Sequence, residues 1–178
     1  MTSHQVYIIS GGQGAGKTTF LGRLITELQL KKINVGGFVA EGLWKEDKRF
    51  GFNLIRITDS TSISLCMKDP DSSHMKLGNF YFNPDAIKMG NEILQHDQKT
   101  ADIIIIDEIG IFELQERVWF NSFQQLLASC SKPLIITVRE KIVDEVIKKF
   151  GLQHVQVFGV NDHVPNIIDT ILAGLKNN

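Results

Sequence analysis

The sequence predicts an α/β fold: a mostly parallel sheet with helices on both faces and an antiparallel hairpin insertion. Strand-like and helix-like segments alternate along most of the chain, which is typical of βαβ units in a parallel sheet. Right-handed crossovers bring the carboxyl ends of such strands to one edge of the sheet. We therefore expect the functional residues to follow the ends of the strands.

The first such strand end carries a complete phosphate-binding motif. The pattern GxxxxGK[ST] is met by Gly11, Gly12, Gln13, Gly14, Ala15, Gly16, Lys17 and Thr18. An apolar run over 6–9 precedes it, and apolar residues at helical spacing over 20–28 follow it. Strand, glycine loop and helix are the context that favours a P-loop over a chance glycine-rich turn. The expected fold class is therefore the P-loop NTPase three-layer sandwich.

The residue types of the motif suit nucleotide binding. Glycines let the backbone N–H groups from Gly12 to Thr19 point inward as an anion-binding nest at a helix N-terminus. Lys17 would reach the β- and γ-phosphates, and the Thr18 hydroxyl would bind Mg²⁺. ATP or another nucleoside triphosphate is the expected substrate, with Mg²⁺ as its cofactor.

The middle of the chain interrupts the strand–helix alternation. A strand over 35–40 continues into a hairpin with arms at 41–44 and 49–57, and a strand over 63–67 follows. The polar segment 69–79 is expected to be a mobile loop able to lie near the nucleotide. A short strand over 80–82 then leads to a helix capped by Asn83 and Pro84 that runs to about residue 95.

A second strand end carries a pair of carboxylates. Four isoleucines, Ile103–Ile106, predict a central strand buried on both faces, and Asp107 and Glu108 follow it. P-loop hydrolases bind Mg²⁺ with an acidic residue at such a position, so Asp107 is expected to bind the metal through water. Glu108 would face the γ-phosphate and orient or deprotonate the attacking water.

Two alternatives to that interpretation remain open. Asp107 and Glu108 with Ile109 and Gly110 also fit the DxxG of a GTPase switch, but the chain has no Asn-Lys-x-Asp to recognise guanine. The nearest candidate, over 131–133, lacks the acid. The simpler alternative is that the two carboxylates only cap a strand.

The rest of the chain predicts further regular elements. They are a helix over 115–129, a buried strand over 133–138, a helix over 141–150, a strand over 155–158 and a helix over 165–175. Thr137, at the end of a strand, would sense the γ-phosphate or hold the attacking water. Arg139 would act as an arginine finger, or else be a surface arginine that pairs with Glu140 or another acid. Glu113 would orient the site, or else only cap a helix start.

Composition limits the class of protein. The chain of 178 residues is expected to form a single domain over 1–178, and 43% of its residues are hydrophobic. Its net charge of −1 gives no electrostatic drive toward nucleic acid. No apolar run approaches the roughly 20 residues that span a membrane, and Met1–His4 lead into a strand without a signal peptide, so the cytoplasm is expected. The two cysteines and five histidines show no metal-ligand spacing.

With these motifs in place, the chain resembles the small nucleoside-triphosphatases of the THEP1 type from about residue 6 to its last helix. The most selective match is the string Asp-Glu-Ile-Gly-x-x-Glu-Leu over 107–114, and the others are Gly37-Phe38, Arg-Phe-Gly-Phe over 49–52 and Thr137-Val138-Arg139. Ile111 stands where the family usually has lysine, and the acidic, arginine-bearing run after Gly37-Phe38 is reduced to 41–44. The resemblance implies Mg²⁺-dependent hydrolysis of nucleoside triphosphates to diphosphate and phosphate, with loose base selectivity.

Two other functions remain open from the residues alone. A nucleotide or small-metabolite kinase would need clustered arginines, whereas the five arginines here are dispersed: Arg23, Arg49, Arg56, Arg117 and Arg139. A slow nucleotide-dependent switch or accessory protein would use Trp44 and Trp119 as a partner surface, although such tryptophans often pack inside. The sequence identifies no protein partner, oligomeric state or base preference, and an arginine from a second subunit would serve in place of Arg139.

Overall fold

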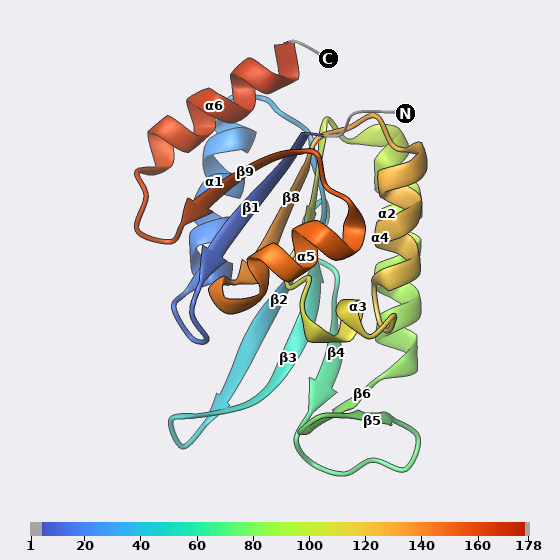
Figure 1. Cartoon of the computed structure of the whole chain (residues 1–178). Coiled ribbons are helices and arrows are strands. Elements are labelled where there is room, and N and C mark those ends of the chain that lie inside the picture. Colours follow the sequence, from blue (N-terminus) through green and yellow to red (C-terminus); the bar gives the residue numbers. More distant parts are fainter. Residues whose placement is uncertain (1–4, 177–178) are drawn as a thin grey trace.

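A nine-stranded sheet with helices on both faces forms the protein (Figure 1), here a computed structural model that describes residues 5–176. Residues 1–4 and 177–178 lie outside the described part, so the expectation for Met1–His4 stays an expectation. The strand order is β5-β6-β4-β3-β2-β7-β8-β1-β9. The predicted α/β sandwich is thus confirmed, and its sheet is mixed.

One half of the sheet is parallel and carries the strand ends that matter. Its members are β1 (Gln5–Gly11), β2 (Val35–Lys45), β7 (Ile103–Ile106), β8 (Leu134–Arg139) and β9 (His154–Gly159). Parallel pairing joins β2 to β7, β7 to β8, β8 to β1 and β1 to β9. Because β8 lies between β1 and β7, the P-loop strand and the carboxylate strand end at the same edge, one strand apart.

The other half of the sheet is antiparallel and extends from β2. It contains β3 (Lys48–Arg56), β4 (Ser62–Met67), β5 (Met75–Leu77) and β6 (Phe80–Phe82). The segment 69–79 is therefore not entirely a loop, because Met75–Leu77 pairs with β6 in a hairpin. The hairpin contacts α3 (Ile111–Leu114), since the rings of Phe82 and Phe112 lie 5.4 Å apart.

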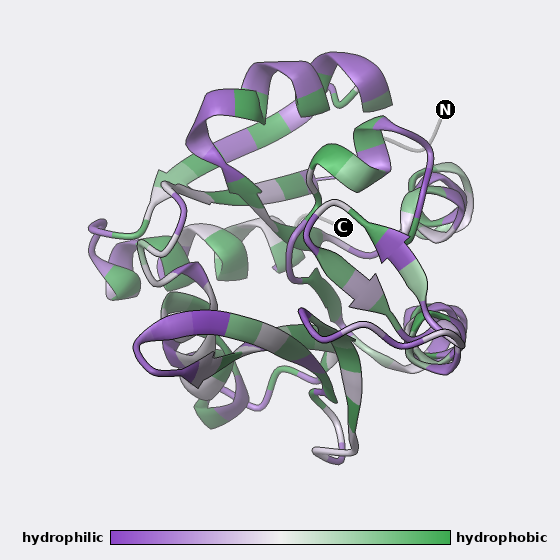
Figure 2. Ribbon diagram, turned by 90° about the horizontal axis from the view of Figure 1, so that it is seen from below, coloured by the Kyte–Doolittle hydropathy of each residue, from purple (hydrophilic) through white to green (hydrophobic). Residues whose placement is uncertain are grey.

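Helices cover the two faces through two separate apolar cores. Helices α1 (Lys17–Leu30) and α6 (Val164–Lys176) cover one face, and α2 (Pro84–Thr100), α4 (Phe120–Ser129) and α5 (Val143–Phe150) cover the other. Isoleucines of β7 alternate between the cores, as expected for a strand buried on both faces. Figure 2 shows hydrophobic strands at the centre and helices that mix hydrophobic and hydrophilic residues. No helix of residues 5–176 has the length and hydropathy to span a membrane.

The predicted helix over 115–129 is wrong in its first turn. A single turn, α3, comes earlier, and α4 begins only at Phe120. Between them Glu116 and Val118 have positive φ angles of 62° and 52°, which a helix cannot contain. A short 3₁₀ turn, η1 (Glu140–Ile142), likewise precedes α5. Trp119 is buried against the ring of Phe38, whereas Trp44 is exposed, so only Trp44 remains at the surface.

Candidate active site

The P-loop turns between β1 and α1 as the sequence predicts. Gly14 and Gly16 have φ angles of 74° and 86°, in the left-handed region that favours glycine, and Lys17 starts the helix. The Lys17 ammonium donates hydrogen bonds to the carbonyl oxygens of Gly11 and Gly12, at 3.1 and 3.0 Å. Partial burial lowers the pKa of Lys17, and the nearby Arg139 adds to this, while Glu108, Asp107 and Glu140 oppose it. Lys17 therefore lies among the charges of both strand ends.

Asp107 joins the carboxylate strand to the P-loop helix. Its Oδ2 accepts a hydrogen bond from the Thr18 hydroxyl at 2.7 Å and another from the Ala40 N–H at 3.0 Å. The side chain is 2% exposed, and burial raises the pKa of Asp107, while its hydrogen bonds from Thr137, Ala40 and Thr18 favour the charged form. The predicted pair of Mg²⁺-binding residues, Thr18 and Asp107, is thus in direct contact.

Thr137 connects Asp107 to Glu108. Its buried hydroxyl donates to Asp107 Oδ1 at 2.6 Å and accepts from the Glu108 N–H at 2.7 Å. Glu108 has a φ angle of 68°, a left-handed conformation that is costly for a residue with a side chain. The Glu108 backbone is therefore held in a strained conformation beside the buried carboxylate.

Arg139 contacts the Glu108 side chain. Its Nη2 lies 3.1 Å from Glu108 Oε1, and the two side chains are 45% and 38% exposed. Of the two sequence interpretations, the surface pair is seen, but the acid is Glu108 rather than Glu140. This pair lies at the predicted site, so the contact is compatible with the arginine-finger interpretation as well.

The donor set of the site fits a magnesium ion. Mg²⁺ prefers oxygen ligands and is bound in proteins by one or two carboxylates together with substrate phosphates and water. Asp107 and Thr18 offer a carboxylate and a hydroxyl beside the phosphate loop. Within residues 5–176 no group of three or more His, Cys, Asp or Glu side chains is arranged to hold a metal, so an all-protein cage is not available there.

The predicted site residues all lie at the carboxyl edge of the parallel strands. The P-loop follows β1, Asp107 and Glu108 follow β7, and Thr137 and Arg139 end β8. Two other arginines are engaged elsewhere: Arg49 stacks 4.1 Å from the Trp44 ring, and Arg56 pairs with Asp97 at 2.6 Å. These two arginines are therefore not available for an arginine cluster of the kind that kinases use.

Sequence reasoning missed one part of the site, Ala40, and left the role of another, Glu113, open between orienting the site and capping a helix. Ala40 binds Asp107 through its backbone N–H, and an alanine side chain gives no signal for that. Glu113 is more than a helix cap, because its carboxylate binds the Gly110 N–H at 2.8 Å and also the Trp119 N–H at 3.2 Å. Its burial, which the acidic residue type does not predict, was the missing signal.

Comparison with known proteins agrees with this geometry. The profile of a family described as NTPase matches residues 6–172. The chain is 31% identical to the nucleoside-triphosphatase THEP1 of Methanocaldococcus jannaschii, over 94% of this chain and 98% of that protein. It is 32% identical to the THEP1 of Thermotoga maritima, over 96% and 95% of the two chains.

Solved structures show the same fold. THEP1 from Aquifex aeolicus aligns with a TM-score of 0.72 and 23% identity, over 97% of this chain and 99% of that one. A human cancer-related nucleoside triphosphatase aligns with a TM-score of 0.69 and 19% identity, over 98% of each chain. The chain therefore belongs to the THEP1 family of nucleoside-triphosphatases, and it is an enzyme that hydrolyses nucleoside triphosphates.

Proposed function

We propose that the protein is a Mg²⁺-dependent nucleoside-triphosphatase that acts on ATP and on triphosphates of other bases, with residues 1–178 as one catalytic domain. The observation that supports this most is the 2.7 Å hydrogen bond between Thr18 and Asp107. It joins the P-loop to the carboxylate strand, and it puts the two expected Mg²⁺-binding residues within reach of one ion.

The phosphate groups are bound by the P-loop. The N–H groups from Gly12 to Thr19 line the nest, and the partial positive charge of the α1 N-terminus stabilises the anion. Lys17 exchanges its contacts with the Gly11 and Gly12 carbonyls for the β- and γ-phosphates. Thr18 and Asp107 would hold Mg²⁺, the latter through water, and the ion supplies charge neutralisation on the phosphate oxygens.

Hydrolysis then needs an activated water. Glu108 accepts a proton from water as the new O–P bond forms and the bond between the γ-phosphorus and the bridging oxygen breaks, which releases diphosphate and phosphate. Thr137 holds the Glu108 backbone in register with Asp107. Arg139 moves from Glu108 to the γ-phosphate oxygens and neutralises their charge as a finger in cis.

Broad base use is supported by what the relatives are called, since their names specify a nucleoside-triphosphatase without a particular base. The residues proposed for the site are assigned to the phosphates, the metal and the attacking water, and none of them is assigned to the base.

Steady-state phosphate release tests this proposal. Release is measured separately from ATP, GTP, CTP and UTP, once with Mg²⁺ and once with EDTA instead of Mg²⁺. No phosphate acceptor other than water is added. Release from several bases, within about tenfold of one another and lost in EDTA, is the expected result. Release from a single base, or unchanged release in EDTA, would contradict the base range or the metal requirement, respectively.

A further inference from the structure

The turn that carries Glu108 is held by hydrogen bonds on both sides. Three successive N–H groups take part: Glu108 donates to the Thr137 hydroxyl, Ile109 donates to the Thr137 carbonyl oxygen at 3.0 Å, and Gly110 donates to Glu113. Thr137 thus fixes the turn from β8, and Glu113 fixes it from the start of α3. Together these contacts oppose the release of the strained backbone at Glu108.

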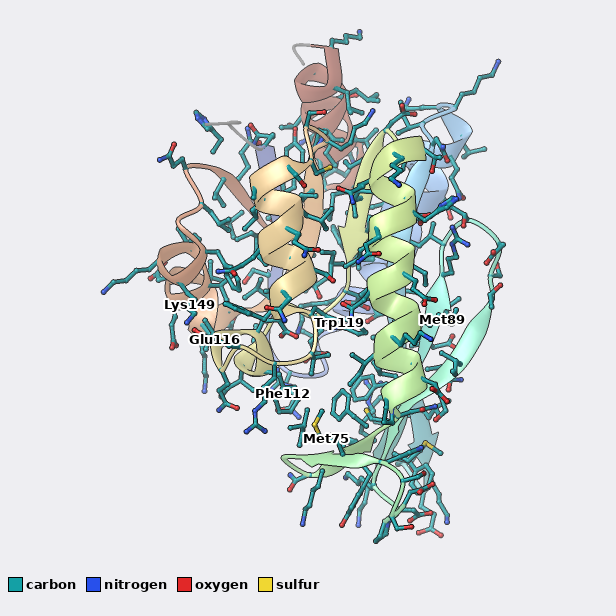
Figure 3. The ribbon with its side chains drawn as sticks, turned by 90° about the vertical axis from the view of Figure 1, so that its right-hand side faces the viewer. Met75, Met89, Phe112, Glu116, Trp119 and Lys149 are labelled. Atoms are coloured by element: carbon teal, nitrogen blue, oxygen red, sulfur yellow. The ribbon has the colours of Figure 1, made fainter. Side chains whose placement is uncertain are left out.

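Glu113 binds a second segment with its other oxygen. Oε2 accepts from Gly110, and Oε1 accepts from the N–H of Trp119, which precedes α4. The Trp119 ring lies between α2 and α4 (Figure 3), and a Cβ added at Gly90 of α2 would lie 2.5 Å from it. The carboxylate therefore connects the Glu108 turn to the backbone of a residue whose side chain is packed against a helix and cannot shift freely.

The segment between these two contacts is strained. Glu116 and Val118 both have positive φ angles, and a left-handed β-branched residue such as Val118 is uncommon. Glu116 also pairs with Lys149 of α5 at 2.7 Å (Figure 3). Strained backbone persists only where its surroundings determine it, and such sites gather near functional residues.

A carboxylate is a costly choice for this position. Glu113 is 2% exposed, and no Lys, Arg or His of residues 5–176 lies within ion-pair distance of it. An amide in its place would offer only one acceptor oxygen and would present an NH₂ group to one of the two N–H donors. Only a carboxylate accepts both hydrogen bonds with separate oxygens. The geometry of these two contacts therefore explains why a carboxylate is buried here.

We propose that Glu113 is a positioning residue for hydrolysis, which acts through Glu108. By accepting the Gly110 and Trp119 N–H groups together, its carboxylate holds the turn after β7 so that Glu108 keeps the left-handed conformation that presents its side chain to the attacking water. Glu113 touches neither substrate nor metal. The inference depends on the proposed role of Glu108, and it adds a residue that the phosphate and metal contacts do not include.

The test compares Glu113→Gln with Asp97→Asn. Asp97 is the control because it is also buried and also accepts a hydrogen bond from a glycine N–H, that of Gly37 in β2 at 2.9 Å. It differs from Glu113 in that it is also paired with Arg56, so its loss should cost at least as much stability. Gly37 has a φ angle of 96°, which glycine adopts without strain, so Asp97 supports no strained residue of this turn. A purely structural carboxylate should behave like Asp97, and a positioning carboxylate should not.

For Glu113→Gln we expect kcat to fall about 10- to 100-fold with KM for MgATP changed less than about threefold, because a misplaced catalytic group costs rate rather than binding. Asp97→Asn should lower the melting temperature and leave kcat within about threefold of wild type. Glu113→Asp, which keeps the charge but shortens the reach, is a second variant with the same expected loss. A folded Gln or Asp variant with wild-type kcat, or an equal kcat loss in Asp97→Asn, would overturn the proposal.

A double variant separates this proposal from the one on which it depends. If Glu113 acts through Glu108, adding Glu113→Gln to Glu108→Gln should change the residual rate less than about twofold. Multiplied losses would show that Glu113 acts elsewhere. Normal hydrolysis by Glu108→Gln alone would instead overturn the role of Glu108, whatever Glu113→Gln does.

Discussion

The guanidinium of Arg139 donates a hydrogen bond to the carboxylate of Glu108, with 3.1 Å between Nη2 and Oε1. The contact pairs the proposed finger with the proposed water-activating group. Both side chains are partly exposed, so the pair itself contributes little to stability and can separate at low cost. A γ-phosphate that attracts Arg139 would at the same time free Glu108 to contact water.

Arg139→Ala should therefore lower kcat more than it weakens MgATP binding. The expected loss in kcat is about 10- to 1,000-fold, below the largest effects of arginine fingers, because Lys17 and Mg²⁺ still neutralise charge. Steady-state kinetics with ATP measure it. Arg23→Ala, on the exposed face of α1, is the control and should be silent. Unchanged kcat in Arg139→Ala would show that Arg139 is only a surface arginine, or that an arginine from a second subunit acts as the finger.

Thr137→Val should impair turnover although no charge is lost. The variant keeps the volume but removes the hydroxyl that donates to Asp107 and accepts from Glu108, which leaves the partly buried Glu108 N–H without its partner. We expect kcat to fall about 10-fold or more and the Mg²⁺ requirement to rise. Thr137→Ser, which restores the hydroxyl, should recover most of the rate. Equal activity of the Val and Ser variants would exclude a role for the hydroxyl.

Lys17→Ala should abolish nucleotide binding rather than only slow the reaction. The ammonium is the point charge that faces the β- and γ-phosphates, and the neighbouring Glu108 and Asp107 would otherwise repel the nucleotide. Calorimetric titration with a slowly hydrolysed ATP analogue should show at least about 100-fold weaker binding. Lys31→Ala, after the end of α1, gives the matched loss of one positive charge and should bind normally. Retained affinity in Lys17→Ala would contradict the P-loop assignment.

Ionisation of Glu113 should lower the free energy of unfolding as the pH rises. Burial raises the pKa of Glu113 from 4.5 to about 7, so between these values the folded state binds more protons than the unfolded state. The contribution of Glu113 to the free energy of unfolding is therefore fully present below the pKa of the unfolded state, and it is lost as the pH rises through the pKa of the folded state. The loss amounts to about 3 kcal/mol if the whole shift is realised.

Glu113→Gln, which does not titrate, removes that dependence. Urea unfolding at about pH 5 and about pH 8 should show the variant gaining stability relative to wild type by about 1–3 kcal/mol between the two. The same variant should be the slower enzyme, as expected when a residue is kept for activity at a cost in stability. A stability difference that does not change with pH would show that Glu113 titrates in its ordinary range.

The fold and the centre of the site were predictable because local signals decided them. Strand–loop–helix context identified the P-loop around Lys17, and four isoleucines marked the strand that ends at Asp107. Right-handed parallel topology then brought both to one edge. Each of these features depends on a short stretch of sequence that is compatible with few other local structures.

What sequence reasoning missed depends on backbone contacts and strain. Helical spacing suggested one helix from 115, but tertiary contacts hold Glu116 and Val118 in left-handed conformations and end that turn. Met75–Leu77 looked like loop because polar residues surround it, although pairing with β6 makes it a strand. Ala40 contributes only its backbone, and the second hydrogen bond of Glu113 depends on where Trp119 lies.

The most direct test of the account is the Glu108→Gln variant, studied with ATP and Mg²⁺ in a single turnover beside equilibrium binding. The substitution keeps the side-chain volume and removes the proton acceptor, so MgATP affinity should stay within about threefold while the hydrolysis rate falls at least about 100-fold. That result would identify Glu108 as the group that activates water. Wild-type hydrolysis by the variant would contradict the central claim, even if every phosphate and metal contact is as described.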